Sequence, residues 1–494
     1  MFRHLYQEKL LWLILGIALL LRLPLLSGSF WLDEAAQALE SSRPFSQQLD
    51  IVPDFQPPLL HYITHFSLYF GDSEWWLRTT GALLPGLISI WATHQIGRKL
   101  GSARLGLVAA LLLATSSFHI FYSQELRPYA LPLMFATLSW LVILNKSRHY
   151  LLLFTGLSIA GIYSSYLYPF LLLSQLTHLL LIDQLQLRKI AVVAGSIGLS
   201  FLPWLPMFMQ QLAAGSEVRI QLPGWSEVVS IPQLKSLPLV FLKFIFGVLD
   251  VEATGLFIAP LLGLSILVLI ALYQSIRHFP RMKASPRSLQ TLLIWMFIPL
   301  ITAWIVSFWI PVVQPKRVIF LQPTFYLLIM WVMLNLRQKL IMQLTLAILL
   351  GVNLWSTTAY YLDKRLQRED WRALIHNLEA KYPAGDLVAV FSFPEPFAPW
   401  RWYANPDTAT LSTGALHVSD VPDLNAALKT ATEYENIVLF EYLQDLSDPE
   451  RTVRQEIELY GYSTIEILDY PGIGFTRVYA KPDSNISAQF ARMK

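Results

Sequence analysis

Cysteine is absent from this 494-residue chain, and charged residues are scarce. Without thiols, no part of the chain can be held by disulfides, and thiolate chemistry is excluded. Charged residues make up 14% of the chain, whereas a soluble domain carries about a quarter. Hydrophobic residues make up 54%. These proportions exclude an ordinary soluble domain and indicate an integral membrane protein.

Signals of several other protein classes are also missing. The net charge of +3 is too small to indicate nucleic acid as a partner. There is no glycine-rich phosphate-binding loop and no Walker pattern, so nothing indicates the use of nucleotide energy. The histidines lack a common metal-ligand spacing, and we therefore assign no zinc site. The chain has no internal repeat of the kind found in many transporters.

Eleven apolar runs in the first 360 residues are predicted to cross a bilayer, which takes about 20 helical residues. Basic residues gather in alternate loops, beginning with Arg3 and Lys9. The positive-inside rule therefore places these loops and the amino terminus in the cytoplasm. We expect the first run to be a retained signal-anchor, because Ser27-Gly28-Ser29 is a weak cleavage site. The predicted spans are residues 10–27, 78–97, 104–121, 128–145, 149–165, 167–183, 188–209, 255–276, 290–310, 318–336 and 340–358.

The first loop on the predicted outer side is acidic. This loop, residues 28–77, carries a series of carboxylates and a single basic residue, Arg43. Its length predicts helices that lie along the membrane surface. The apolar segment 237–249 is short and contains Lys243 and Gly247. It is therefore predicted to be interfacial or re-entrant and not a further span.

The chain changes character after Tyr360, because charged residues follow and no later segment is apolar enough to cross a membrane. Alternating strands and helices predict a small α/β domain, which lies outside the cytoplasm after eleven crossings. The predicted domains are thus 1–360, helical and membrane-embedded, and 361–494. The predicted strands are 387–393, 437–442, 462–468 and 475–480, and the predicted helices are 372–380, 424–430 and 448–459.

Two adjacent carboxylates, Asp33 and Glu34, follow the first predicted span directly. Charge beside a membrane is costly unless it is paired, solvated or functional. If Asp33 opens a short helix, Glu34 points about 100° away around the axis. One carboxylate could then face a cavity while the other holds a positive partner. The alternative is that Asp33 only caps the helix and Glu34 only favours its macrodipole.

Other polar residues lie in the same predicted outer loop. Gln56 and His61 flank the Pro57-Pro58 pair, which stiffens the chain before an apolar helix. The alternative interpretation is a loop with solvated polar side chains. Arg78 follows two tryptophans that suit the membrane interface, and by default it would be a snorkelling anchor.

Basic residues near two later outer loops are candidates for binding an anion. The very short loop 122–129 holds Glu125, Arg127 and Tyr129 at a fixed depth. An arginine there could bind two phosphate oxygens or could form a structural ion pair. Lys316 and Arg317 lie on the outer side, against the positive-inside trend.

Carboxylates, cations and a large amphipathic loop on one side suit a substrate with a lipid tail, a phosphate and a polar acceptor. In glycosyl transfer from a lipid phosphate, a carboxylate can take the proton of the acceptor hydroxyl. Cations stabilise the phosphate that leaves. A divalent metal such as Mg²⁺ or Mn²⁺ could share that second role, bound by carboxylate oxygens of Asp33 and Glu34.

Several short motifs resemble those of the bacterial GT-C glycosyltransferases, and more narrowly the protein mannosyltransferase and aminoarabinose transferase group. These motifs are Leu21-Arg22-Leu23, Trp31-Leu32-Asp33-Glu34-Ala35, Gln56-Pro57-Pro58-Leu59, Arg78, Gln124-Glu125-Leu126-Arg127-Pro128-Tyr129 and Pro315 to Pro323.

The resemblance implies an inverting transferase that uses a polyprenyl-phosphate sugar. It also implies that Asp33 is the base, that Glu34 supports it, and that Arg127 and Arg317 contact phosphate. Aminoarabinose transferases have Glu-Lys before the paired prolines, where this chain has Phe55 and Gln56. This departure argues against that sugar and against lipid A as the acceptor.

We therefore expect a polytopic α-helical protein of the cytoplasmic membrane, with an extracytoplasmic α/β domain at its carboxy terminus. The expected partners are the bilayer, a polyprenyl-phosphate-linked sugar, and a glycan, lipid or protein acceptor. The main alternative is a transporter or flippase of a lipid-linked or anionic solute. A membrane scaffold whose outer domain binds a partner is a third hypothesis.

Overall fold

The computed structural model describes residues 2–222, 232–250, 262–263, 266, 285–335 and 339–481. The chain divides into two compact units. The first comprises Met1–Ser27, Phe45–Gln210 and Ser230–Leu366, and the second comprises Gly28–Pro44, Gln211–Val229 and Gln367–Lys494. Residues 28–44, which the sequence analysis placed in the membrane domain, thus group with the carboxy-terminal residues.

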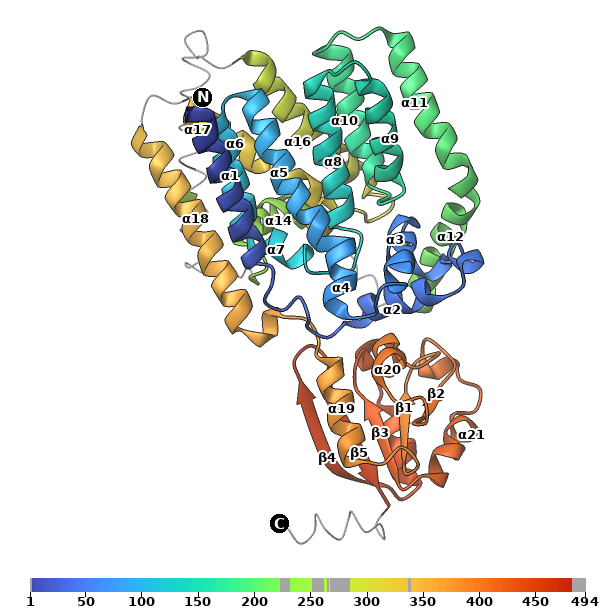
Figure 1. The fold of residues 1–494 in the computed structure, drawn as a ribbon. Helices are drawn as coiled ribbons and strands as arrows, with labels where there is room; N and C mark the ends of the chain where they lie inside the picture. Colours follow the sequence, from blue (N-terminus) through green and yellow to red (C-terminus); the bar gives the residue numbers. More distant parts are fainter. Residues whose placement is uncertain are drawn as a thin grey trace. The chain divides into compact units, whose positions relative to one another are not determined.

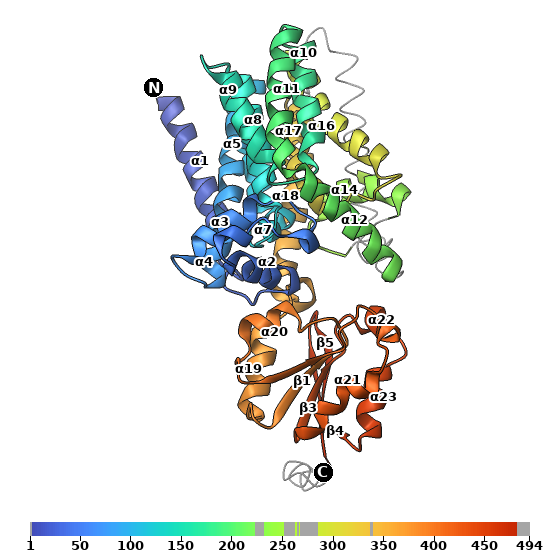
Figure 2. The same ribbon diagram turned by 90° about the vertical axis from the view of Figure 1, so that its right-hand side faces the viewer.

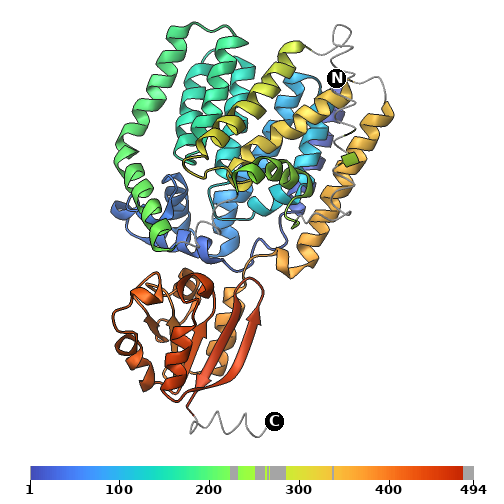
Figure 3. The ribbon, with the colours of Figure 1, turned by 180° about the vertical axis from the view of Figure 1, so that it is seen from behind.

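The first unit is built from long helices that run side by side, as Figure 1 shows from the front and Figure 3 from behind. Short helices and turns connect them, among them α3 (Leu59–Leu68), α4 (Glu74–Arg78) and α7 (Ser117–Tyr122). The longer helices are α1 (Phe2–Leu20), α5 (Leu84–Leu100), α6 (Ala103–Thr115), α8 (Ala130–Asn145), α9 (Tyr150–Ile162), α10 (Tyr168–Leu181), α11 (Leu187–Phe201), α12 (Leu205–Gln221), α14 (Gln233–Phe246), α16 (Pro286–Val306), α17 (Gln322–Leu334) and α18 (Lys339–Leu362), the end of α12 belonging to the second unit.

The predicted multi-span helical fold is confirmed. Within the described residues, four helical stretches are long and apolar enough to cross a membrane, namely Leu187–Val218, Pro286–Val306, Lys316–Leu334 and Lys339–Leu362. Four shorter apolar helices, α6, α8, α9 and α10, accompany them. The total of eleven spans stays a prediction, and the predicted span 255–276 lies almost wholly outside the described residues.

Small residues allow two of these helices to approach closely. A Cβ atom at Gly97 of α5 would lie 2.5 Å from the Cα of Gly106 in α6, and one at Gly106 would lie 2.2 Å from the carbonyl oxygen of His94. Both distances are shorter than any real contact, so only glycine fits. Glycine pairs of this kind are typical of helix packing in membranes, where van der Waals contact contributes most of the association energy.

The segment 237–249 forms most of α14, which packs against α7, α16 and α18. Pro238 lies inside α14, and Lys243 near its end donates to the carbonyl oxygen of Leu249 at 2.6 Å. A 14-residue helix is shorter than a bilayer requires. The expectation that it does not cross the membrane stays a prediction.

The second unit contains a five-stranded mixed sheet of order β2-β1-β3-β5-β4. The strands are β1 (Leu387–Phe391), β2 (Ala409–Ser412), β3 (Asn436–Phe440), β4 (Ser463–Tyr470) and β5 (Gly474–Ala480). Strand β1 pairs in parallel with β2 and β3, whereas β5 pairs antiparallel with β3 and β4. The central strands β1 and β3 are buried along their whole length, as expected where helices cover both faces of a sheet.

Helices cover the two faces of this sheet, as Figure 2 shows. On one face, α19 (Trp371–Lys381) and α20 (Ala398–Tyr403) pack an aromatic core against Phe391 and Phe440. On the other, α21 (Leu424–Leu428) and α23 (Thr452–Leu459) pack against Val390 and Leu439. A further helix of this unit, α2 (Leu32–Ser42), contacts α20.

Four strand predictions and three helix predictions are confirmed in this unit. Strand β2 was missed, because it has only four residues and is half-exposed. The predicted helix 448–459 begins later, at Thr452. The Asp448 carboxylate instead accepts hydrogen bonds from the backbone N–H groups of Thr452 and Val453 at 2.7 and 3.0 Å.

Candidate functional site

The two candidate carboxylates lie in the first turn of α2. The helix begins at Leu32, and the preceding Trp31 gives no side-chain capping bond. The alternative that Asp33 is the N-cap is therefore wrong, because Asp33 is the second helical residue. Asp33 is half-buried, whereas Glu34 is fully buried.

Glu34 has a cationic neighbour within the same unit. Its carboxylate lies 3.9 Å from Nε of Arg368, and both side chains are almost fully buried. Burying a single charge costs several kcal/mol, and a partner of opposite sign offsets that cost. Arg368 was not among the residues that the sequence analysis selected. The one feature of the sequence that pointed to Arg368 was the run of charged residues directly after the last predicted span.

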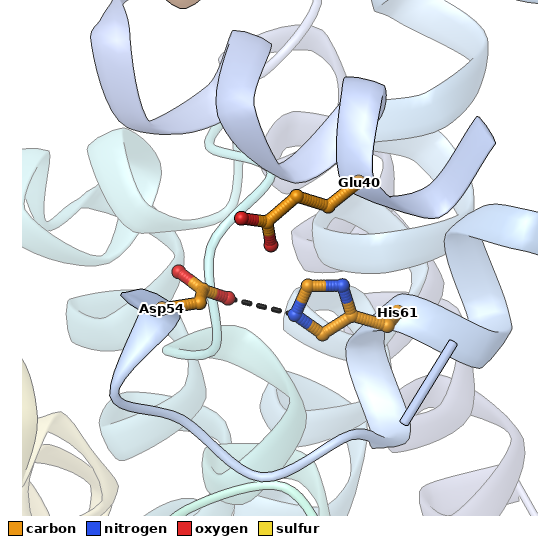
Figure 4. A group of neighbouring side chains, drawn as sticks. All are labelled: Glu40, Asp54 and His61. Atoms are coloured by element: carbon orange, nitrogen blue, oxygen red, sulfur yellow. Dashed lines mark hydrogen bonds and ion pairs between the residues drawn. The ribbon is translucent and has the colours of Figure 1, made fainter. Parts of the chain in front are cut away.

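In the first unit, Asp54 gathers three of the predicted polar residues around it. His61 Nε2 lies 2.7 Å from one carboxylate oxygen (Figure 4). Arg127 lies 2.9 Å from the other oxygen. The amide of Gln56 also donates to Asp54. Burial opposes ionisation of Asp54, but Arg127 and His61 together hold the pKa of this carboxyl below its usual value. Asp54 is thus an anion that orients Arg127.

The chain around Asp54 is shaped by its local sequence. Asp54 ends a 3₁₀ turn (Val52–Asp54), and Phe55 adopts a left-handed conformation with φ of 50°. The two prolines then lead into α3, whose first N–H, that of Leu59, donates to the carbonyl oxygen of Tyr163 at 3.0 Å. His61 consequently lies in the first turn of α3, where it faces Asp54 (Figure 4).

The later basic residues lie close to Arg127 in the same unit. The Arg317 guanidinium donates to the carbonyl oxygen of Pro311 at 3.1 Å and interacts electrostatically with Arg127 and Tyr129. Lys316 Nζ lies 5.7 Å from the centre of the Tyr129 ring, within the range of a cation–π contact. The loop after α7 and the turn before α17 therefore bring together Arg127, Tyr129, Lys316 and Arg317.

Two further predicted site residues have contacts with the backbone. Arg78 is 1% exposed and donates to the carbonyl oxygen of Leu26 at 2.9 Å. The default interpretation of Arg78 as a snorkelling anchor is therefore wrong. Glu125 is buried, and its carbonyl oxygen accepts a hydrogen bond from the N–H of Arg127 at 2.8 Å. This bond forms a tight turn that positions Arg127.

The sequence analysis did not give a role to Arg22, which is fully buried. Its guanidinium donates to the carbonyl oxygens of Ala18 and Ala114 at 2.7 and 3.0 Å and lies 2.7 Å from Nδ1 of His119. The feature of the sequence that could have pointed to Arg22 is the position of an arginine at the end of an apolar run. A buried arginine of this kind needs several acceptors, so it ties the end of α1 to α6 and α7.

Comparison with known proteins shows a common fold. Residues 55–208 match the model of the dolichyl-phosphate-mannose-protein mannosyltransferase family. No curated protein matches the sequence.

Solved structures resemble the chain over nearly its whole length. ArnT from Cupriavidus metallidurans in the apo state has a TM-score of 0.58 at 13% identity, covering 95% of this chain and 97% of its own. The same protein bound to undecaprenyl phosphate has a TM-score of 0.57 at 12% identity, with coverages of 96% and 98%. The Archaeoglobus fulgidus oligosaccharyltransferase in the apo form has a TM-score of 0.51 at 12% identity, with coverages of 98% and 75%. The resemblance drawn from the sequence motifs is thereby confirmed.

Proposed function

We propose that this chain is a GT-C glycosyltransferase that uses a polyprenyl-phosphate sugar. The match of residues 55–208 to the protein mannosyltransferase family supports this proposal. The sugar would pass to an acceptor at the outer face of the cytoplasmic membrane. ArnT, whose fold this chain shares, has been observed with undecaprenyl phosphate bound. The α/β domain would then lie outside the cytoplasm.

One observation carries the proposal on the donor side. Arg127, Lys316 and Arg317 come together in the first unit, and Asp54 holds Arg127 in place. Clustered cations repel one another, so such a cluster is favoured where an anion binds. Arginine suits a phosphate, because its planar group can donate to two oxygens at once. Tyr129, Gln56 and His61 lie next to these charged residues.

The proposed reaction breaks one bond and forms another at the anomeric carbon. The acceptor hydroxyl oxygen attacks this carbon, and the bond between the carbon and the phosphate oxygen breaks. The hydroxyl proton passes to the Asp33 carboxylate, and polyprenyl phosphate leaves as an anion. Arg127 and Arg317 stabilise the negative charge that develops on the leaving oxygen. Attack opposite the leaving group inverts the configuration.

In this proposal Glu34 supports Asp33 and does not itself take the proton. Its carboxylate already has a cationic partner, Arg368, at 3.9 Å. A divalent metal held by Asp33 and Glu34 would compete with Arg368 for Glu34. The residues present therefore fit a metal poorly.

The proposal is tested by transfer assays with purified protein in lipid vesicles. Asp33→Asn is expected to lower kcat by about 10²–10⁴-fold, which is the usual contribution of a general base. Arg127→Gln is expected to raise the KM for the donor by about 10–100-fold, as for loss of a charged hydrogen bond. Asp386→Asn and Arg401→Gln, both exposed on the α/β part, are matched controls that should retain full activity.

Two outcomes would overturn the proposed function. Full activity of Asp33→Asn would show that Asp33 is not the base. Net movement of the lipid-linked sugar across vesicles that contain no acceptor would favour a transporter or flippase, since a transferase should show no such flux.

A further inference from the structure

We propose that Arg368 and Glu369 are positioning residues that hold the first turn of α2, and with it Asp33, in its working place. The inference rests on the proposed role of Asp33. The second unit would thus have a function in catalysis. All the contacts that support this inference lie within that unit.

The amino-terminal end of α2 lacks a cap from its own sequence, because Trp31 makes no side-chain capping bond. The first N–H groups of a helix need acceptors from elsewhere. The N–H of Leu32 donates to a carboxylate oxygen of Glu369 at 3.4 Å, across 337 positions of sequence. Glu369 thus acts as the cap that α2 lacks.

Glu369 is itself held firmly by two aromatic residues. Trp371 Nε1 donates to the same carboxylate oxygen at 2.6 Å, and the Tyr442 hydroxyl donates to the other oxygen at 2.8 Å. Trp371 is fully buried in the core beside the sheet, where it contacts Tyr442. The carboxylate therefore has a fixed position relative to the sheet, and it passes that position on to α2.

The segment that precedes α2 is attached in the same way. Ser29 Oγ accepts a hydrogen bond from the N–H of Arg372 at 3.1 Å, and the N–H of Phe30 donates to the Tyr403 hydroxyl at 2.7 Å. Phe30 is fully buried and makes an edge contact with the ring of Trp402. Residues 29, 30 and 32 are therefore each bound by the carboxy-terminal part of the chain.

Arg368 attaches the same helix turn through a second residue. It faces Glu34 at 3.9 Å, the residue next to Asp33. Asp33 is also close enough to Glu369 for its charge to act on that carboxyl, and burial together with this charge raises the pKa of Glu369 to about 7. In the sequence, Asp33 thus lies between Leu32, whose N–H is bound by Glu369, and Glu34, whose partner is Arg368. A base displaced by about 1 Å loses much of its rate, up to roughly 100-fold.

The proposal is tested by combining kinetics with hydrogen exchange on the full-length protein. Arg368→Gln and Glu369→Ala are expected to lower kcat between about 10-fold and 100-fold, while the KM for the donor changes little. Amide exchange in residues 30–36 should become faster, and exchange in β1 and β3 should not. Arg368→Lys, which keeps the charge, should recover part of the lost kcat.

Coupling to Glu34 gives a second measurement. If Arg368 acts through Glu34, then Arg368→Gln should have little further effect in a Glu34→Gln background. The matched controls are Arg401→Gln, at an exposed ion pair, and Asp386→Asn, at an exposed carboxylate. Both should leave kcat and the exchange of residues 30–36 unchanged.

The result that would overturn the inference is unchanged exchange in residues 30–36 for both Arg368→Gln and Glu369→Ala. Additive losses in the double variant would also overturn the role of Arg368 through Glu34. Exchange does not depend on the reaction, so a failure of this inference can be told apart from a failure of the proposed function. The latter would appear as absent transfer by the unmodified protein.

Discussion

Replacing Glu369 by glutamine should change how the stability of the second unit depends on pH. Burial and the nearby Asp33 charge raise the pKa of Glu369 to about 7 from 4.5. The folded protein therefore binds a proton that the unfolded chain has lost over this range. The stability that this bound proton contributes is fully present below about pH 4.5 and is lost as the pH rises through about 7.

The size of this effect follows from the two pKa values. A difference of one pKa unit corresponds to about 1.4 kcal/mol. Between pH 5 and pH 8, titration of this single group should lower the free energy of unfolding by about 2–3 kcal/mol. For a unit of this size, that corresponds to a decrease in Tm of roughly 5–10 °C. Glu369→Gln has no group to titrate, so it should lack this component.

The assay compares Tm at pH 5, 6, 7 and 8 for the unmodified protein, Glu369→Gln and the exposed control Glu433→Gln. Other groups titrate in all three proteins, and the difference between variants at each pH isolates Glu369. The Tm of Glu433→Gln should follow that of the unmodified protein, whereas the Tm of Glu369→Gln should fall less steeply with pH. Equal slopes for Glu369→Gln and the unmodified protein would refute the reasoning, because Glu369 would then ionise alike in both states.

Three further predictions concern the first unit and the metal. Asp54→Asn should raise the KM for the donor by roughly tenfold, because Arg127 loses the anion that orients it; an unchanged KM in transfer assays would contradict this role. Gly106→Ala should sharply lower the yield of monodisperse protein in detergent, since its Cβ would lie 2.2 Å from a backbone oxygen. The control Gly156→Ala should not lower the yield, because its Cβ would meet nothing within 4 Å. Equal yields would contradict the packing argument. Treatment with EDTA should leave transfer unchanged, and a loss that Mg²⁺ or Mn²⁺ restores would show that a metal is needed.

Much of the candidate site was predictable because the residue types were out of place in an apolar chain. Asp33 and Glu34 follow a long apolar run, and Lys316 and Arg317 break the distribution of basic residues between the two sides. Arg127 lies in a loop too short to move. Each is visible from sequence because the bilayer makes charge costly and so restricts where it occurs.

The roles of individual side chains were less predictable, because they depend on partners far away in the chain. Arg78 resembles an interfacial anchor from its neighbours, but it is buried against Leu26. Asp33 resembles a helix cap, but the acceptor at that helix end belongs to Glu369. Local sequence can specify that a helix end needs an acceptor, but not which residue supplies it.

By itself, the sequence determined the class of this protein: apolar runs demand a membrane, alternating charge gives the loops their predicted sides, and alternation of strands and helices gives the carboxy-terminal α/β fold. These are local properties, since they depend on the solvent around each segment and on the period of its side chains. Only the tertiary structure decided that residues 28–44 group with the carboxy-terminal part and that Arg368 faces Glu34. Such pairings depend on packing between segments more than 300 residues apart, and no local pattern records them.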